Sequence, residues 1–186
     1  MTYIYTPNSL YFVTYKTYHS QNYFDSIENK EILQSQILTA SSKFNVTVVA
    51  YAILSNHYHL LIDVDESESQ MTKFLQQVNG GTSFRISKPS HVQSIWEPKN
   101  KYSRLIMGEK AMFQVIGYVV GNPLKHGIAK DFHELDDYNY CNYSEICEAH
   151  GREMINNLVL ENCELPFSDS SLIEKVYFSE ENENPS

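Results

Sequence analysis

The chain has 186 residues, of which 42% are hydrophobic and 13% aromatic, a composition that excludes an intrinsically disordered protein and suits one globular domain. Its three cysteines lack CxxC spacing and residues 1–7 lack the parts of a secretion signal, so we expect a reduced, cytoplasmic protein. The net charge is −9 and the apolar runs are too short to span a membrane, so no membrane partner is expected.

The first part of the chain has the pattern of a strand, a helix and a hairpin. Residues 10–18 are β-branched and aromatic, which predicts a first strand. Residues 26–44 carry apolar side chains at the spacing of an amphipathic helix. Residues 46–54 and 57–64 predict two further strands that are joined by a short turn.

The next part predicts a helix, a strand and a second helix. The first helix is expected to end at the two glycines of residues 80–81, and residues 85–98 are expected to be irregular. Residues 101–106 predict a fourth strand, and residues 108–122 predict an amphipathic helix. Pro123 is expected to end this helix, because the residue before a proline is disfavoured in the α region.

This order of elements predicts an α+β fold. The expected architecture is a ferredoxin-like split βαβ (RRM-like) antiparallel sheet with helices on one face and a C-terminal helical extension. Residues 1–147 are expected to form the main domain, and residues 148–178 a helical extension packed on it, with helices at residues 148–163 and 168–176. Residues 179–186 are expected to form an acidic, disordered tail.

Two histidines flank one hydrophobic residue in His57-Tyr58-His59, inside an apolar run. Side chains alternate along a strand, so His57 and His59 are predicted to lie on one face and Tyr58 on the other. Two imidazoles on one face can hold a metal ion if a third ligand comes from elsewhere. A pair with this spacing is also compatible with two surface or half-buried histidines on an edge strand.

A tyrosine and an asparagine in the predicted helix at residues 108–122 offer the missing groups. Tyr118 and Asn122 are four residues apart and share a helix face, so a phenol and an amide oxygen would lie side by side. Gly117 and Gly121 each cost roughly 1 kcal/mol relative to alanine in a helix, and we interpret them as positions where a ligand backbone approaches closely. Tyr118 alone is weak evidence, because the chain has 14 tyrosines.

The net charge is unevenly distributed along the chain. Residues 146–186 carry nine acidic and two basic residues, whereas residues 85–130 carry eight basic and two acidic ones, a local charge of +6. Local sign matters more than total charge for attracting a polyanion, although a basic run is also compatible with an ordinary solvated surface. The acidic segment either folds over the basic stretch and mimics a polyanion there, or completes the core.

These segments together resemble the single-strand HUH tyrosine transposase family. Residues 55–62 (SNHYHLLI) resemble its His-hydrophobe-His motif, and residues 118–127 (YVVGNPLKHG) resemble its nucleophile helix and the Asn-Pro turn that follows. Residues 10–17, 96–106 and 140–144 are similar to segments of the branch associated with repetitive extragenic palindromes (REP). Their combination, in the right order and spacing, is specific even though each motif alone is weak.

The resemblance implies a metal-dependent DNA-strand transferase. Such an enzyme cleaves and rejoins single-stranded DNA at or near a hairpin through a 5′-phosphotyrosine intermediate. The family's nucleophile maps to Tyr118, its paired histidine ligands map to His57 and His59, and its third ligand maps to Asn122. Two imidazoles and one amide oxygen, with no thiolate nearby, favour Mg²⁺ or Mn²⁺ as the cofactor.

Further side chains near the predicted nucleophile are candidates for catalysis and DNA binding. Lys125 is a candidate for deprotonating the phenol or binding phosphate, although a solvated lysine at a helix end is the more common situation. Trp96 is expected to be a core residue or to stack on an unpaired base. The candidate DNA contacts from the basic stretch are Arg85, Lys99, Lys101, Tyr102 and Arg104.

Two alternatives to a strand transferase stay open at this point. The first is a non-catalytic DNA hairpin-binding regulatory protein on the same fold, which would tend to lose one of the four chemical groups. The second is an RNA-binding ferredoxin-like module, which requires aromatic pairs on the central strands. The expected partner in the favoured interpretation is single-stranded DNA with a hairpin. A monomer is favoured over a dimer, although the family contains both.

Overall fold

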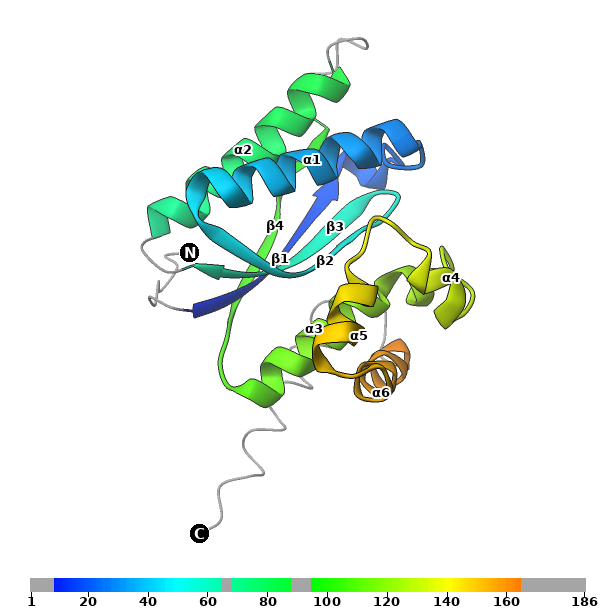
Figure 1. The fold of residues 1–186 in the computed structure, drawn as a ribbon. Helices are drawn as coiled ribbons and strands as arrows, with labels where there is room; N and C mark the ends of the chain where they lie inside the picture. The colour runs from blue at the N-terminus through cyan, green and yellow to red at the C-terminus, as the bar shows by residue number, and fades with distance from the viewer. Residues whose placement is uncertain (1–8, 65–67, 88–94, 165–186) are drawn as a thin grey trace.

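The computed structural model describes residues 9–64, 68–87 and 95–164 (Figure 1). The expected short helix at residues 168–176 and the expected tail at residues 179–186 lie outside these ranges. The described elements in chain order are β1 (Ser9–Thr17), the 3₁₀ turn η1 (Tyr18–Ser20), α1 (Ile27–Phe44), β2 (Val46–Ile53), β3 (His57–Val64), α2 (Glu68–Ser87), β4 (Trp96–Ile106), α3 (Glu109–Lys125), α4 (Phe132–Asp136), α5 (Tyr143–His150) and α6 (Arg152–Cys163).

The strands form one four-stranded sheet in the order β2-β3-β1-β4. All three neighbouring pairs are antiparallel, so the split βαβ arrangement predicted from the order of elements is confirmed. The strand that carries the two histidines, β3, lies between β2 and β1. This position excludes the interpretation in which the histidines belong to an exposed edge strand.

Helices cover both faces of this sheet (Figure 1). Tyr11 and Val13 of β1 pack with α1 and α2 on one face, whereas Phe12 packs with α3, α5 and α6 on the other. The expectation of helices on one face holds for α1 and α2 and is wrong for α3. Strand β3 is buried at seven of its eight positions, so its side chains are covered on both faces of the sheet. Covering both faces requires a layer of helices on each of them, and α3 belongs to the second layer.

Two helices continue past the residues that were expected to end them. Helix α2 runs through both glycines to Ser87. A Cβ on Gly81 would lie 1.9 Å from Oε1 of Gln36, so this glycine lets α1 pack closely against α2. Helix α3 contains Pro123 and continues to Lys125, although proline has no backbone donor and its ring crowds the preceding turn. The backbone N–H of His126 still donates to the carbonyl oxygen of Asn122, so the helical turn is kept across the proline. The fourth strand is also longer than expected, because it begins at Trp96.

The C-terminal part of the described chain folds as two helices where one was expected. Gly151 separates α5 from α6 with a φ of 94°, a backbone conformation that favours glycine. The expected domain boundary after residue 147 lies inside α5. Ile155 and Val159 of α6 are buried in the same cluster as α3, so this helix completes the core. Within the described ranges, no helix combines the length and the apolar character needed to cross a membrane.

Helix α6 packs directly on the two glycines of α3. A Cβ on Gly117 would lie 2.6 Å from Cβ of Leu158, and a Cβ on Gly121 would lie 2.9 Å from Cγ1 of Val159. The interpretation of these glycines as positions for a ligand backbone is therefore wrong. They allow one helix to approach another, which is a common reason for glycine inside a helix.

We expect Gly117→Ala to lower the free energy of unfolding by about 1–2 kcal/mol, because the new methyl group would overlap Leu158, including its backbone carbonyl carbon at 3.0 Å. Gly80→Ala in α2 is the matched control. Its Cβ would have no atom within 4 Å, so alanine should stabilise the helix by about 0.5–1 kcal/mol. Urea denaturation measures both changes. A gain of stability in both variants would contradict this helix packing.

Candidate active site

Strand β3 presents two histidines toward α3. His57 and His59 are 8% and 2% exposed, and their ring centroids are 4.9 Å apart. Tyr58, between them, packs on the opposite face with α1 and α2. The alternation predicted from the sequence therefore describes this strand, and the two imidazoles lie side by side beneath α3.

Hydrogen bonds fix both imidazole rings. Oδ1 of Asn56 accepts a hydrogen bond of 2.7 Å from the Nδ1–H of His57. Nδ1 of His59 lies 2.8 Å from Oγ1 of Thr14. Burial, together with the nearby charges of His126 and Lys16, lowers the pKa of His59 to about 3. His59 is therefore a neutral imidazole, the form that binds metals.

Asn122 of α3 lies against His59. Its side chain is fully buried, and its Nδ2 donates a 2.6 Å hydrogen bond to the carbonyl oxygen of Tyr118. Within the described part of the chain, Oδ1 of Asn122 and Nε2 of His59 are both buried without a hydrogen-bond partner. Asn122 is nevertheless close enough to oppose the lowering of the His59 pKa. A buried polar atom left unsatisfied costs about 1–3 kcal/mol, so two of them together need an explanation.

These atoms fit a divalent cation. Imidazole nitrogens and an amide oxygen are metal ligands, and a cation between them would satisfy both unpaired atoms. Among residues 9–64, 68–87 and 95–164, no group of three or more His, Cys, Asp or Glu side chains is arranged to hold a metal ion. A metal at the histidine pair therefore depends on a different third ligand, and the amide of Asn122 is placed to provide it.

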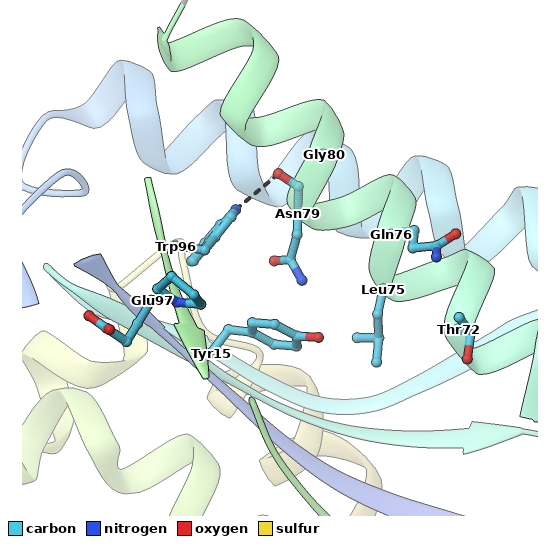
Figure 2. A pocket seen from close by; sticks show the side chains of 9 residues that line it. Tyr15, Thr72, Leu75, Gln76, Asn79, Gly80, Trp96 and Glu97 are labelled. Atoms are coloured by element: carbon cyan, nitrogen blue, oxygen red, sulfur yellow. Dashed lines mark hydrogen bonds between the residues drawn. The ribbon is translucent and has the colours of Figure 1, made fainter. Parts of the chain in front are cut away.

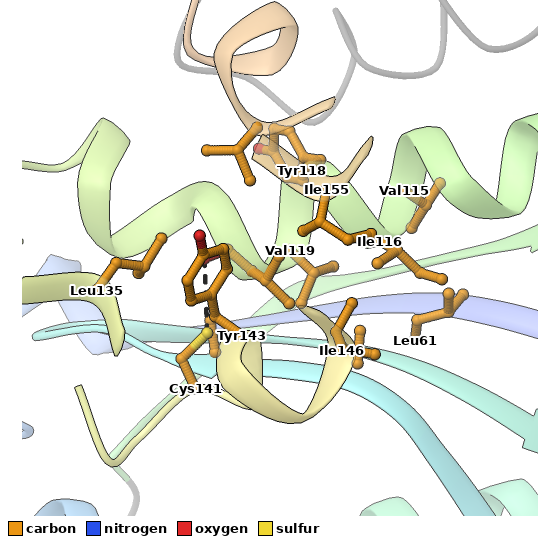
Figure 3. Packing of buried hydrophobic residues seen from close by; sticks show 14 of the residues in the cluster. Leu61, Val115, Ile116, Tyr118, Val119, Leu135, Cys141, Tyr143, Ile146 and Ile155 are labelled. Carbon is orange, nitrogen blue, oxygen red and sulfur yellow. Dashed lines mark hydrogen bonds between the residues drawn. The ribbon is translucent and has the colours of Figure 1, made fainter. Parts of the chain in front are cut away.

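Tyr118 lies one helical turn before Asn122. Its ring centroid is 5.5 Å from that of His59 and 5.8 Å from that of Phe12, and the residue is 4% exposed. Figure 3 shows Tyr118 on α3 in the same buried layer as Ile155 of α6. The structure thus brings together the phenol, the amide and the imidazoles that the motifs select.

Lys125 lies beside the same phenol ring. Its Nζ is 5.2 Å from the ring centroid of Tyr118, within the range of a cation–π contact. The same Nζ donates a 3.2 Å hydrogen bond to the carbonyl oxygen of Asn162 in α6. Lys125 is therefore part of the site and also joins α3 to α6, so it is not an isolated solvated side chain.

His126 is a further imidazole at this site that the motifs do not indicate. Its ring centroid is 5.1 Å from that of His57, and its backbone N–H donates to the carbonyl oxygen of Asn122 at 2.9 Å. The signal is helical spacing, because Tyr118, Asn122 and His126 follow one another at intervals of four. This spacing could not be recognised from the sequence, because the helix was expected to end at Pro123 and His126 lies after that residue.

The structure does not gather the candidate DNA contacts in one place. Arg104 of β4 pairs with Phe12 of β1, so it belongs to the sheet face that α3 covers. Arg85 lies in the last turn of α2, on the opposite face. Lys99, Lys101 and Tyr102 belong to β4, and their side chains lie outside the described part of the structure.

Trp96 belongs to the core on the α2 side of the sheet. It is 7% exposed and lies against Phe24, Tyr15 and Tyr58. Its indole N–H donates a 2.9 Å hydrogen bond to the carbonyl oxygen of Asn79. The core role expected for this residue is confirmed by these contacts, and stacking on an unpaired base stays a prediction.

We expect Thr14→Val to weaken binding of Mn²⁺ about tenfold, because it removes the hydrogen bond that orients the His59 ring for a metal. Titration of Mn²⁺ followed by electron paramagnetic resonance measures this affinity. Thr82→Val is the matched control, since this buried hydroxyl donates to Val78 within α2 on the other side of the sheet. Equal affinities in Thr14→Val and the unmodified protein would contradict a role for Thr14.

Comparison with known proteins identifies the family on independent grounds. A family model described as "Transposase IS200 like" matches residues 8–121, which is more than half of the chain. A solved structure described as "Structure of the REP associates tyrosine transposase bound to a REP hairpin" has a TM-score of 0.62 at 17% identity, and the match covers 81% of this chain and 86% of that one. At this identity the likeness shows a shared fold.

A second solved structure, a putative transposase from Deinococcus radiodurans R1, has a TM-score of 0.43 at 16% identity, over 64% of this chain and 92% of that one. No curated protein matches the chain.

Proposed function

The chain belongs to the family of IS200-like transposases, and from this premise we propose that it is a metal-dependent DNA-strand transferase with Tyr118 as its nucleophile. The observation that carries the proposal is the pair of unsatisfied buried atoms, Nε2 of His59 and Oδ1 of Asn122, beside the phenol ring. Its substrate would be single-stranded DNA at or near a hairpin. The similar structure that is bound to a REP hairpin supports this choice.

In this proposal, His57, His59 and Asn122 hold Mg²⁺ or Mn²⁺. When bound there, the cation would orient the scissile phosphate and stabilise the charge that develops on it during the reaction. The Tyr118 oxygen attacks the phosphorus atom and loses its proton. The bond between phosphorus and the 3′ oxygen breaks, the 3′ oxygen takes up a proton, and a 5′-phosphotyrosine and a free 3′-hydroxyl result. The reverse reaction with another 3′-hydroxyl joins two strands without an external energy source.

Lys125 has a supporting role in the same proposal. A phenol has a pKa of about 10, so attack at neutral pH requires a group that favours the phenolate. The ammonium group of Lys125 lies over the Tyr118 ring and supplies a positive charge next to it. This charge would favour loss of the phenolic proton and would also attract the scissile phosphate.

Burial of the site favours a second candidate function. Tyr118 is 4% exposed and Asn122 is fully buried, so a phosphate reaches the phenol only after side chains or helices move. A protein that never makes this movement would still bind a hairpin and would act as a non-catalytic regulator of the DNA it binds. Covalent chemistry distinguishes the two functions.

The test uses the full chain, Mn²⁺ and an end-labelled single-stranded palindrome that forms a hairpin with unpaired tails. A covalent adduct that migrates slowly on a denaturing gel, and that EDTA prevents, is the expected result. Hairpin binding without any adduct, across a range of Mn²⁺ concentrations, would overturn the transferase and support the regulator. The role of Tyr118 itself is tested by substitution, as argued in the Discussion.

A further inference from the structure

A hollow of about 650 Å³ lies between α2, β1 and the first residues of β4 (Figure 2). It is on the face of the sheet opposite Tyr118, because Tyr15 and α2, which line it, pack with the cluster on that face. The proposed strand transfer uses no residue of this hollow. Its size is sufficient for one nucleotide with room for solvent.

Two aromatic rings form a rigid wall of the hollow. The ring centroids of Tyr15 and Trp96 are 6.1 Å apart, at an interplanar angle of 73°. Trp96 is held by its hydrogen bond to the carbonyl oxygen of Asn79, and Tyr15 stacks on Tyr58 at a centroid distance of 5.7 Å. Both rings are therefore fixed before any ligand arrives, which reduces the entropy lost on binding.

Amide groups are placed opposite this wall. Oδ1 of Asn79 accepts a 2.9 Å hydrogen bond from the hydroxyl of Tyr58, so the orientation of this amide is set. The Nδ2 of Asn79 then makes no hydrogen bond to the described residues and points into the hollow (Figure 2). Gln76, one turn earlier on α2, adds a second, exposed amide at the rim. Amides supply the donors and acceptors that the edge of a heterocyclic base requires.

The charge of the lining excludes a phosphate group. None of the residues that line the hollow is basic, and one of them, Glu97, is acidic. Basic residues instead follow in the chain, since Lys99 and Lys101 belong to the same strand, β4. This order suits a nucleotide whose base enters the hollow and whose phosphate stays outside it.

We propose that this hollow, which we call the α2 pocket, binds one unpaired base of the DNA substrate. The proposal rests on the proposed function and deepens it, because it names a part of the substrate that is recognised. The base would lie against the rings of Tyr15 and Trp96 and form hydrogen bonds with the amide of Asn79. A sheet separates it from Tyr118, so the base belongs to a nucleotide remote from the scissile phosphate.

The chain offers a direct spectroscopic probe and a clean variant. Trp96 is the single tryptophan of the protein, so intrinsic tryptophan fluorescence reports on the α2 pocket alone. Gly80 lines the pocket, and a Cβ there would have no atom within 4 Å. Gly80→Leu therefore adds a bulky side chain at the wall of the pocket, with a Cβ that overlaps no neighbouring atom, and Gly80→Ala is the matched control that strengthens the helix with a single methyl group.

The probes are two labelled hairpins with the same stem and six-nucleotide tails, one with bases in the tails and one with abasic tails that keep every phosphate. We expect the base-carrying hairpin to quench Trp96 and to bind about tenfold tighter than the abasic one, as measured by fluorescence anisotropy. In Gly80→Leu both hairpins should bind equally, without quenching. Gly80→Ala should behave like the unmodified protein.

Failure of this proposal differs from failure of the strand transferase. Binding of both hairpins with equal affinity and no quenching in the unmodified protein would overturn the base pocket and leave hairpin binding intact. Base-dependent quenching that Gly80→Leu also shows would overturn the pocket too, because the base would then stack elsewhere. Base-dependent quenching that Gly80→Leu removes, in a protein that forms no covalent adduct, would support the pocket and overturn only the strand transferase.

Discussion

Tyr118→Phe should lower the rate of adduct formation with hairpin DNA by at least about a thousandfold and leave the affinity for the hairpin unchanged. The substitution removes the attacking oxygen and keeps the ring, and loss of a nucleophile has effects of this size in other covalent enzymes. The ring keeps its contacts with His59 and Phe12, so the fold is retained. Denaturing gels measure the adduct, and anisotropy of the labelled hairpin measures binding.

Tyr138→Phe is the control for this result. The Tyr138 hydroxyl donates a 2.7 Å hydrogen bond to the carbonyl oxygen of Ile53. Tyr138→Phe therefore also removes one phenolic hydroxyl and its hydrogen bond, at a residue outside the proposed catalytic set. This variant should form the adduct at the normal rate. If Tyr118→Phe formed it equally well, another tyrosine would be the nucleophile and the proposed chemistry at α3 would be wrong.

The strands are the part of the fold that the sequence predicts best, because their periodicity is local. Alternation in His57-Tyr58-His59 is sufficient to place both imidazoles on one face, and β1, β2 and β3 occur where β-branched and aromatic residues cluster. The helical spacing of Tyr118 and Asn122 is equally local. These two periodicities select the residues that the fold then brings together, although they carry no information on distance.

Features that depend on distant contacts could not be predicted in the same way. Gly117 and Gly121 suggest open space until α6 is seen to lie on them, more than thirty residues later in the chain. A proline likewise suggests that a helix ends. The hydrogen bond from the backbone N–H of His126 to the carbonyl oxygen of Asn122 shows that the turn continues, so His126 lies on the same helix face as Asn122. The distribution of charge along the sequence also does not indicate on which face of the sheet a basic residue lies. Arg85 and Arg104 belong to the same basic stretch of sequence but lie on opposite sides of the sheet.

The metal proposal predicts that Asn122→Asp makes the stability of the protein depend on a divalent cation. The substitution keeps the shape of the side chain but puts a carboxylate at a fully buried position. Without a cation, burial of this group should lower stability by about 3 kcal/mol, or about 6–12 °C in Tm for a chain of this size. Addition of Mn²⁺ should restore most of the loss, because a carboxylate is a stronger ligand than an amide.

Asn162→Asp in α6 is the matched control for a buried amide outside the proposed ligands. Asn162 is 2% exposed, its Oδ1 has no hydrogen-bond partner in the described residues, and its Nδ2 donates to backbone carbonyl oxygens as that of Asn122 does. Asn162→Asp should also be destabilised, but Mn²⁺ should not restore it. Thermal denaturation in EDTA and in Mn²⁺ compares the two variants. Equal recovery of both, or of neither, would show that Asn122 is not a metal ligand, because only a cation at the histidine pair distinguishes the two buried carboxylates.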